Sequence, residues 1–464
     1  MAPFRIDKIT DRFSPGFLVI AILATVSTII VWMRPESTIE GLEFWVTSRP
    51  HYSSYKPVID RWKATGEENV NLVLLEGRAL ERRMMSSFFT GTPIAEMLEV
   101  TTGAAKKAWR GPLEAVGFTD LTDILHEKGI YEQFNEPSFS GWTTRGRIFG
   151  LPHDVHPVLL TYRADLVEAA GIDVEELDTW DKFMEAMRPL VKDLNGDGRP
   201  DQYILEMAEA SAGIITPLIM QAGGDYFDED DRVSIDTELN ARVLSKFAVW
   251  AAAGPNKLTA DKTIGDGPGR KLQMDGYVLA WLTPDWRAGQ ERLYLGSLAG
   301  KLKLMPLPAW EEGGRRTTVM GGTMVGIPKS NPNPEDALRI AVSLYSDLEI
   351  ARDMFAVTNI ISPVKATWDD PFYDEPDPFY SGQPNGRLFI NQAPHVPVRS
   401  ASPFLELAGV EVGIAYGRLI KYAGAEKIYD PDVLYPKARE LLGRAQKDVE
   451  RQVNRNIFID RNES

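Results

Sequence analysis

Short apolar runs alternate with stretches in which apolar residues recur at helical spacing, and this alternation predicts an α/β fold. The run Leu42–Thr47 is apolar with partial alternation, as in a half-buried strand. In the stretch 55–65, Val58 and Trp62 share one face of a helix, which Gly66 can end in the left-handed conformation. The same pattern predicts strands at 71–75 and 158–162, and helices at 78–90, 165–170, 240–253, 334–348 and 431–453.

An extended segment comes after the first third of the chain. Gly146 and Gly150 bracket a short apolar pair, which indicates a small turn and strand. Pro152 and Pro157 then fix φ and forbid a helix between them. The segment therefore joins the N-terminal third of the chain to the remainder, either as a strand–loop–strand inside one domain or as a connection between two domains.

One apolar run near the N-terminus, Phe17–Met33, has the length of a membrane span and holds no charge. Arg5, Lys8 and Arg12 precede it, which favours a cytoplasmic N-terminus. No Ala-x-Ala-like cleavage site precedes Ser37, which favours an uncleaved anchor over a cleaved signal peptide, although both remain open. In either case residue 41 onward would be exported. The expected parts are a cytoplasmic segment 1–16, a transmembrane or signal helix 17–33 and a linker 34–40.

Composition narrows the classes of function. The chain of 464 residues has 51 Lys and Arg against 66 Asp and Glu, a net charge of −15. An acidic surface argues against nucleic acid as a partner, because phosphates need a basic surface. The chain holds no Cys, which excludes disulfides, thiol nucleophiles, thiolate metal sites and a lipid-modified cysteine anchor.

The loop Asp193–Asp201 has the spacing of an EF-hand-like calcium loop. Gly198 stands at a turn position, while Ile204 occupies the position where a bidentate Glu is usual. The loop therefore predicts either a structural calcium site or an acidic loop of Asx turns. The expected calcium ligands are Asp193, Asn195, Asp197, Arg199 through its backbone carbonyl, and Asp201.

Several stretches match, in order, the pattern of one protein family. They are Gly146-Arg-Ile-Phe-Gly-Leu-Pro152, Tyr162-Arg-Ala-Asp165, Thr179-Trp-Asp-Lys-Phe183 and Met320-Gly-Gly-Thr-Met-Val-Gly-Ile-Pro-Lys-Ser-Asn331. Over about residues 41 to 450 the chain resembles the bacterial extracellular solute-binding proteins of the sugar-binding, maltose-binding-protein-like type, which serve ABC importers. It departs from the family pattern where Arg163-Ala164 replaces Asn-Lys and where Ala95-Glu96 replaces Pro-Asp.

The resemblance implies a two-lobed periplasmic-binding-protein fold of type II with three hinge crossings. The solute, a sugar or a related compound, would bind between the lobes and favour hinge closure because it contacts both lobes only in the closed state. The closed form would then dock on an ABC transporter permease at the periplasmic face of the inner membrane. The implied lobes are 41–153 with 309–361, and 154–308 with 362–464.

The resemblance also implies which residues contact the solute. Trp286 would stack on the apolar face of a sugar ring, and Gly321 and Gly322 would let the backbone approach the ligand. Glu99 would lie at the C-terminal end of a strand, where open α/β sheets bind ligands. Core packing for Trp45 and Trp286, and a solvated strand end for Glu99, remain alternatives. The full expected set is Trp45, Thr47, Arg49, Glu99, Thr101, Asp154, Asp285, Trp286, Gly321, Gly322 and Phe404.

Two other classes of function remain to be weighed. One is a membrane-anchored receptor or scaffold that uses the same fold without transport; the other is a glycoside-acting enzyme. The sequence has no His-Glu-x-x-His, Gly-x-Ser-x-Gly or Walker motif. His153 and His156 suggest a metal site. However, two residues separate them, and in an extended segment this spacing places the two side chains on different faces. We therefore expect no catalytic residue and no cofactor; a structural calcium at the Asp193–Asp201 loop is one of the two alternatives left open above.

Overall fold

The computed structural model describes residues 14–32, 41–207, 212–254, 257–265 and 267–455. The chain divides into two units, Met1–Gly41 and Leu42–Ser464, and each is described by itself.

The N-terminal unit contains one described helix, α2 (Pro15–Trp32), over most of the predicted apolar run. No helix among the described residues is long and apolar enough to cross a membrane. The prediction of a membrane-spanning helix is therefore not confirmed. Arg5, Lys8, Arg12 and the linker 34–40 lie outside the described residues.

The first sheet has the strand order β2-β1-β3-β12-β6. β1 pairs in parallel with β2 and β3, and β12 runs antiparallel between β3 and β6. Side chains that alternate along β1 build two cores: Phe44 and Val46 pack with Val58 of the following helix, while Trp45 packs against the opposite face. The strands are β1 (Leu42–Val46), β2 (Val70–Leu74), β3 (Met97–Thr101), β6 (Leu151–Pro152) and β12 (Thr323–Gly326).

The second sheet has the order β11-β7-β10-β8-β9. β7 runs antiparallel to β10 and β11, and β8 pairs in parallel with β10 and β9. Every residue of β7 and of β10 is buried, as their continuous apolar runs require for strands covered on both faces. The strands are β7 (Val158–Arg163), β8 (Tyr203–Glu206), β9 (Thr259–Ala260), β10 (Val278–Pro284) and β11 (Leu302–Pro306); a separate pair is β4 (Thr143–Thr144) with β5 (Arg147–Ile148).

The helices form where apolar spacing and capping residues predict them. Gly66 and Gly91 end two helices with φ of +77° and +69°, and Thr179 caps another by accepting the Lys182 N–H at 3.4 Å. The helices of the second unit are α3 (Arg49–Thr65), α4 (Gly77–Thr90), α5 (Thr102–Ala108), α6 (Thr122–Glu127), α7 (Ala164–Ala169), α8 (Trp180–Met187), α9 (Ala212–Gln221), α10 (Glu238–Ala251), α11 (Gly267–Met274), α12 (Asp285–Tyr294), α13 (Pro334–Ser346), α14 (Leu348–Thr358), α15 (Asn385–Gln392), α16 (Leu405–Glu426) and α17 (Pro431–Asn454).

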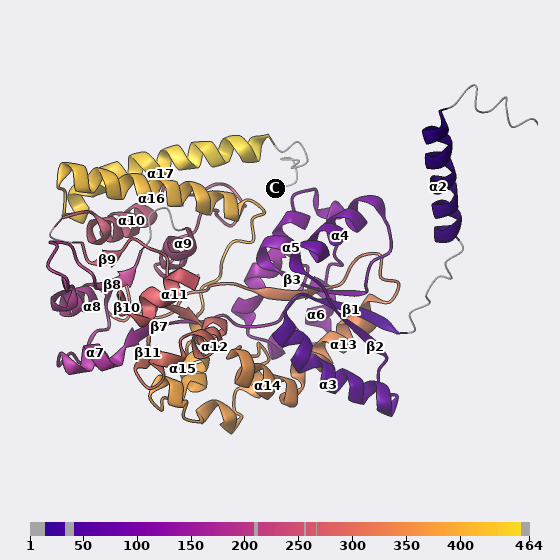
Figure 1. The fold of residues 1–464 in the computed structure, drawn as a ribbon, viewed down its shortest axis with the longest axis horizontal. Helices are drawn as coiled ribbons and strands as arrows, with labels where there is room; N and C mark the ends of the chain where they lie inside the picture. The colour runs from indigo at the N-terminus through magenta and orange to yellow at the C-terminus, as the bar shows by residue number, and fades with distance from the viewer. Residues whose placement is uncertain (1–13, 33–40, 208–211, 255–256, 266, 456–464) are drawn as a thin grey trace, which may run out of the picture. The chain divides into compact units, whose positions relative to one another are not determined.

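The chain passes between the two sheets three times, so each lobe is built from separate stretches of sequence. The first crossing joins β6 to β7, the second joins β11 to β12, and the third comes after α14. Figure 1 shows the result: α13, in orange, lies beside β1 and β2, while α16 and α17, in yellow, cover the second lobe. This is the two-lobed architecture that the resemblance implies.

The packing around the second crossing bears on the lobe boundaries. Trp310 Nε1 donates to the Leu218 carbonyl at 3.2 Å, and the Thr318 hydroxyl donates to the Pro217 carbonyl at 2.6 Å. The segment 309–318 thus lies against α9 of the second lobe, whereas the implied first lobe resumes at residue 309. The chain reaches the first sheet at Thr323.

Candidate functional site

Trp286 and the pair Gly321-Gly322 lie against each other where the lobes meet. Trp286, in the first turn of α12, donates its indole N–H to the Met320 carbonyl at 3.0 Å. Gly321 and Gly322 have φ of +95° and +136°, a region that favours glycine. A Cβ on Gly321 would lie 2.8 Å from the Trp286 indole nitrogen, and one on Gly322 would lie 2.7 Å from a guanidinium nitrogen of Arg399. Both glycines are therefore required by conformation and by space.

Lys106 is a buried cation on α5, with 4% of its surface exposed. Within the described residues its ammonium makes no hydrogen bond or ion pair. Burial, with a further contribution from Arg399, lowers the pKa of Lys106 to about 7, although Asp225 and Glu406 oppose the shift. The Lys106 ammonium thus lacks a hydrogen bond and an ion pair in the part of the chain that the structure describes, and the nearby carboxylates of Asp225 and Glu406 only partly offset the cost of burying its side chain.

Arg399 and Asp225 join Lys106 from the side of the second lobe. Arg399 donates from Nη1 to the Gly321 carbonyl at 2.8 Å, and Asp225 accepts the Ser400 N–H at 2.7 Å. Burial lowers the pKa of Arg399 to about 10 and raises the pKa of Asp225. We use the name interlobe cluster for the polar and aromatic groups that converge here: Lys106, Asp225, Trp286, Gly321, Gly322 and Arg399.

A second group of buried charges lies on the crossings. Asp154 Oδ1 forms an ion pair with His156 Nε2, and Asp154 Oδ2 lies 3.3 Å from His153 Nδ1. The other nitrogen of His156, Nδ1, lies 3.6 Å from Asp285 Oδ1. Burial opposes the charge on His156, but Asp154 and Asp285 raise its pKa to about 9. Burial also opposes the charge on Asp154, but His156 and His153 hold its pKa well below the ordinary value.

The network continues from His153 into the core of the first lobe. The His153 ring stacks on His51 with centroids 4.2 Å apart, His51 Nδ1 lies 2.8 Å from Glu99 Oε1, and the Tyr55 hydroxyl donates to Glu99 Oε2 at 3.0 Å. Burial would raise the pKa of Glu99, but His51 and His153 lower it. We call this group the hinge cluster: His51, Glu99, His153, Asp154, His156 and Asp285.

The trio His51, Glu99 and His153 has ligand atoms within 4.8 Å of one another, which is close enough to consider a metal centre. The ring planes of the two histidines differ by only 20° at a centroid distance of 4.2 Å. Since imidazole lone pairs lie in the ring plane, stacked rings do not direct them to one point. The geometry suits a hydrogen-bonded core and does not suit tetrahedral coordination.

The expected ligand residues thus fall into separate surroundings. Trp286, Gly321 and Gly322 belong to the interlobe cluster, with exposed Thr101 at the end of β3 beside them. Glu99, Asp154 and Asp285, with 0%, 4% and 0% of their surface exposed, belong to the hinge cluster. The others lie outside both clusters. Trp45 is half-buried beneath Arg83, Thr47 is half-buried, Arg49 is exposed, and Phe404 is buried in the core of the second lobe with Arg110 at 6.0 Å.

The acidic loop folds back on itself through its own carboxylates. Asp193 accepts the N–H groups of Gly196 and Gly198, each at 2.7 Å, and Asp197 accepts that of Arg199 at 2.9 Å. The bonds from Gly198 and Gly196 lower the pKa of Asp193. This is an exposed loop of Asx turns with oxygen atoms on alternate residues. A structural calcium site and an acidic loop without calcium therefore both stay open.

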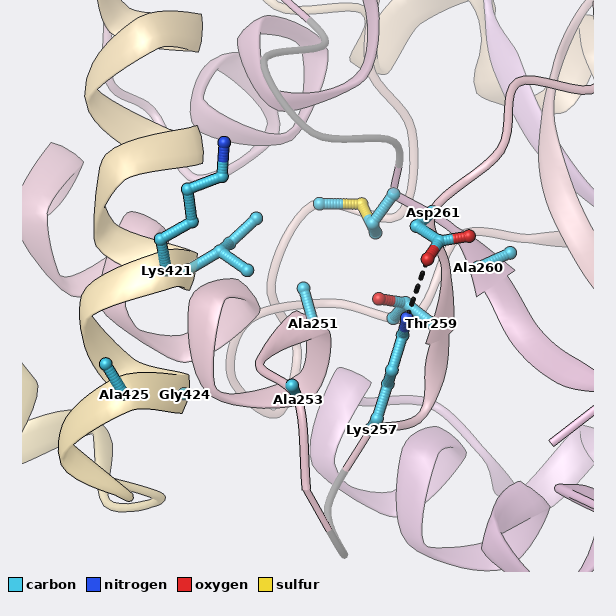
Figure 2. A pocket seen from close by; sticks show the side chains of 11 residues that line it. Ala251, Ala253, Lys257, Thr259, Ala260, Asp261, Lys421, Gly424 and Ala425 are labelled. Carbon is cyan, nitrogen blue, oxygen red and sulfur yellow. Dashed lines mark hydrogen bonds and ion pairs between the residues drawn. The ribbon is translucent and has the colours of Figure 1, made fainter. Parts of the chain in front are cut away.

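A cavity of about 270 Å³ lies in the second lobe, and no residue of the two clusters lines it (Figure 2). Lys257 and Asp261 form an ion pair of 2.8 Å along one wall, and Lys421 of α16 lies on the opposite side. None of the expected ligand residues lines this cavity, so we do not include it in the candidate site.

Sequence reasoning missed Lys106, Asp225, Arg399 and His51, and it set aside His153 and His156. No local motif marks Lys106 or Arg399, because their significance comes only from burial between two lobes. The positions of the histidines could have indicated the hinge cluster. Three of the five histidines in the chain, His51, His153 and His156, lie close in sequence to residues that were predicted to bind the ligand.

Comparisons with known proteins agree with this architecture. A family model described as bacterial extracellular solute-binding protein matches residues 50–347, more than half of the chain. An arabinooligosaccharide-binding protein of Halalkalibacterium halodurans is 23% identical over 74% of this chain and 76% of its own length. A lactose-binding protein of Rhizobium radiobacter is 25% identical over 67% of this chain and 71% of its own length.

A solved structure supports the fold. The ABC transporter associated binding protein from B. animalis subsp. lactis, in complex with β-1,6-galactobiose, is similar with a TM-score of 0.66 and 20% identity. The match covers 91% of this chain and 99% of that chain, so it includes both lobes.

Proposed function

Because the chain belongs to the bacterial extracellular solute-binding protein family, we propose that it captures a disaccharide or oligosaccharide between its lobes and delivers it to an ABC import permease. The family consists of solute-binding proteins rather than catalysts, which agrees with the prediction that the chain is not an enzyme. The resemblance inferred from the motifs is likewise confirmed.

One observation carries the proposal: an aromatic ring and incompletely paired polar groups from both lobes converge at one place. The Trp286 ring is fixed by its bond to Met320, and Lys106 has no partner within the described residues. Sugars present apolar C–H faces and many hydroxyl groups, so they suit a site that combines a ring with donors and acceptors. The names of the relatives, which bind arabino-oligosaccharides, lactose and β-1,6-galactobiose, define the first set of candidates.

The expected residues take three roles in this proposal. Trp286, Gly321 and Gly322 form the centre of the ligand site, and Lys106, Asp225 and Arg399 are added to it. Glu99, Asp154 and Asp285 support the site from the hinge, since their carboxylates already have partners there. Contacts farther out, with the ends of a longer ligand, fall to Trp45, Thr47, Arg49, Thr101 and Phe404.

The test is binding of arabino-oligosaccharides, lactose, maltose and β-1,6-galactobiose by calorimetry and by thermal melting. A ligand at a hundredfold excess over its Kd stabilises the folded state by about 2.7 kcal/mol. Replacing Trp286→Ala removes a stacked aromatic face and is expected to weaken binding by roughly 10- to 100-fold, or about 1.5–3 kcal/mol.

Trp310→Ala is the matched control. Trp310 is also half-buried and also donates its indole N–H to a backbone carbonyl, but it lies against α9. Equal losses in both variants would show that the effect is structural. If none of these sugars binds the native protein, the receptor or scaffold function without transport becomes the better account.

Two further parts of the proposal are structural. We infer that the Asp193 loop binds calcium as a clip within the second lobe, in which case calcium raises the melting temperature and Asp193→Asn removes that rise. We also infer that α2 belongs to an export segment, either cleaved or retained as an anchor. The mass of the mature protein, compared between the membrane and soluble fractions, decides between these two fates.

A further inference from the structure

The hinge cluster ties the three crossings to one another at a single residue, His156. Asp154, on the first crossing, accepts the N–H of Thr323 at 3.4 Å where the second crossing enters β12. Asp285, at the start of α12, accepts the N–H of Ile361 at 3.1 Å on the third crossing. His156 lies between these two carboxylates and contacts both. A positive charge on one imidazole therefore links all three connections between the lobes.

The backbone of His156 adds a second observation. Its φ is +61°, in the left-handed region that residues with a side chain seldom adopt. The residue is 4% exposed and comes four positions after Pro152, with Pro157 directly after it. A strained conformation in a connecting strand persists only when its surroundings hold it, and here the surroundings are the two carboxylates.

We propose that the buried imidazolium of His156 is a latch that holds the crossings at one angle, so that its deprotonation releases the crossings and widens the range of lobe orientations. A neutral imidazole satisfies at most one of the two carboxylates as a donor and presents a lone pair to the other. The left-handed backbone then loses the contacts that hold it, and relaxation of this one residue redirects the first crossing. Hinges act in this way, through a few residues that absorb changes in φ and ψ.

The latch is coupled to the proposed ligand site through neighbouring bonds. Asp285 also accepts the N–H of Trp286 at 2.8 Å. The same carboxylate therefore contacts His156 and fixes the start of α12, the helix that carries the stacking ring of Trp286. His153 donates its backbone N–H to the Thr323 carbonyl at 3.0 Å, directly after Gly322. Opening of the latch therefore moves both walls of the interlobe cluster.

The titratable groups around the latch come from several elements. Burial opposes the charge on His156, but the two carboxylates place its pKa at about 9, above the usual range for histidine. The charged and titratable groups that surround it are Asp154 and His153 on the first crossing, Asp285 on α12, Tyr345 on α13, Tyr373 after the third crossing and Arg399 before α16.

The experiment measures the distance between the lobes directly and needs no sugar, so it remains decisive if the sugar assignment fails. The chain has no Cys, and spin labels on Ser86→Cys of α4 and Arg418→Cys of α16, both exposed, report the separation by pulsed electron resonance. We expect a narrow distance distribution at pH 7 that broadens between pH 8 and 10. An unchanged distribution across this range overturns the proposal.

Variants identify the responsible group. His156→Asn keeps a residue that tolerates the left-handed backbone but removes the charge, and it is expected to show the broad distribution at every pH. Asp285→Asn leaves His156 with one carboxylate. The broadening of the distance distribution is then expected at a pH lower by about one unit or more. A native-like pH response in His156→Asn contradicts the latch.

His126→Gln is the control for histidine replacement, because His126 is a surface histidine 3.5 Å from Glu132. It is expected to keep the native response. If lactose or another sugar binds, His156→Asn is expected to weaken it roughly tenfold at pH 7, a coupling typical of linked conformational changes. Melting curves and circular dichroism verify that each variant is folded.

Discussion

The hinge cluster and the interlobe cluster both contain buried charges, but they differ in whether the chain supplies a partner of opposite charge. In the hinge cluster each carboxylate has a histidine within contact: Glu99 has His51, and Asp154 has His156. In the interlobe cluster Lys106 is buried to the same degree, yet it has no partner among the described residues. Burying a charge is tolerable when the chain itself compensates for it. The hinge cluster balances its buried charges with opposite charges from the chain, although His153 Nδ1 and both ring nitrogens of His156 make no hydrogen bond among the described residues. Charge balance of this kind marks a structural joint, and the lack of an ion pair at Lys106 marks the place where a ligand completes the site.

The largest expected effect comes from breaking a pair in the hinge cluster. Asp154→Ala leaves His153 and His156 buried without their shared carboxylate, and the free energy of unfolding is expected to fall by about 3–5 kcal/mol. Urea denaturation followed by tryptophan fluorescence measures this. The control is Asp165→Ala, which removes a partly exposed carboxylate 2.7 Å from Arg163 and is expected to cost about 1 kcal/mol or less. Equal losses in the two variants would contradict the comparison.

Opposite pH dependence is the next largest effect. The pKa of His156 is raised to about 9 in the folded protein, so its contribution is fully present below pH about 6.5 and is lost as pH rises through 9. The pKa of Lys106 is lowered to about 7, so the unfolded chain binds more protons between pH 7 and 10, and stability rises with pH over that range. The two clusters thus have opposite slopes between pH 7 and 9.

Difference curves separate these slopes. The free energy of unfolding of the native protein minus that of His156→Asn is expected to fall by about 3 kcal/mol between pH 6.5 and 9, at about 1.4 kcal/mol per pH unit. The native protein minus Lys106→Met is expected to rise from pH 7 upward. Two difference curves with slopes of the same sign would show that the clusters do not differ in the proposed way.

The sequence predicted the frame of the molecule well, for identifiable reasons. Glycines that end helices, such as Gly66 and Gly91, and the apolar periodicity place most elements within a few residues. The pair Gly321-Gly322 and Trp286 could also be predicted, because the motifs around them resemble segments that the family places at its ligand site. Their contact with a ligand stays a prediction.

The sequence could not predict which charged residues, far apart along the chain, form pairs in the folded protein. Glu99 was expected at a strand end that faces a ligand, and Asp285 was expected among the ligand residues, but His51 and the crossings enclose these two carboxylates. Lys106 sits in a short polar helix with no motif, and its burial depends on segments of the second lobe far along the chain. Burial of a polar group is a tertiary property, and it decides whether a charge supports the fold or the ligand.

Replacement of Lys106 is expected to change stability by less than the hinge variants do, and in the opposite direction. Lys106→Met keeps the length and apolar stem of the side chain and removes an ammonium that has no partner in the described chain. The variant is expected to be more stable than the native protein by about 1–2 kcal/mol at pH 7, since it no longer buries an ammonium that lacks a hydrogen bond and an ion pair.

The same substitution is expected to weaken sugar binding by roughly tenfold or more, or about 1.4 kcal/mol or above, because the ligand loses a charged hydrogen-bond donor. Chemical denaturation and calorimetry on the same sample measure both quantities. A variant that loses stability but binds sugar normally would mean that Lys106 stabilises the fold and does not contact the ligand. A gain in stability together with a loss of affinity identifies a residue retained for the ligand, since stabilising replacements that cost function are characteristic of binding sites.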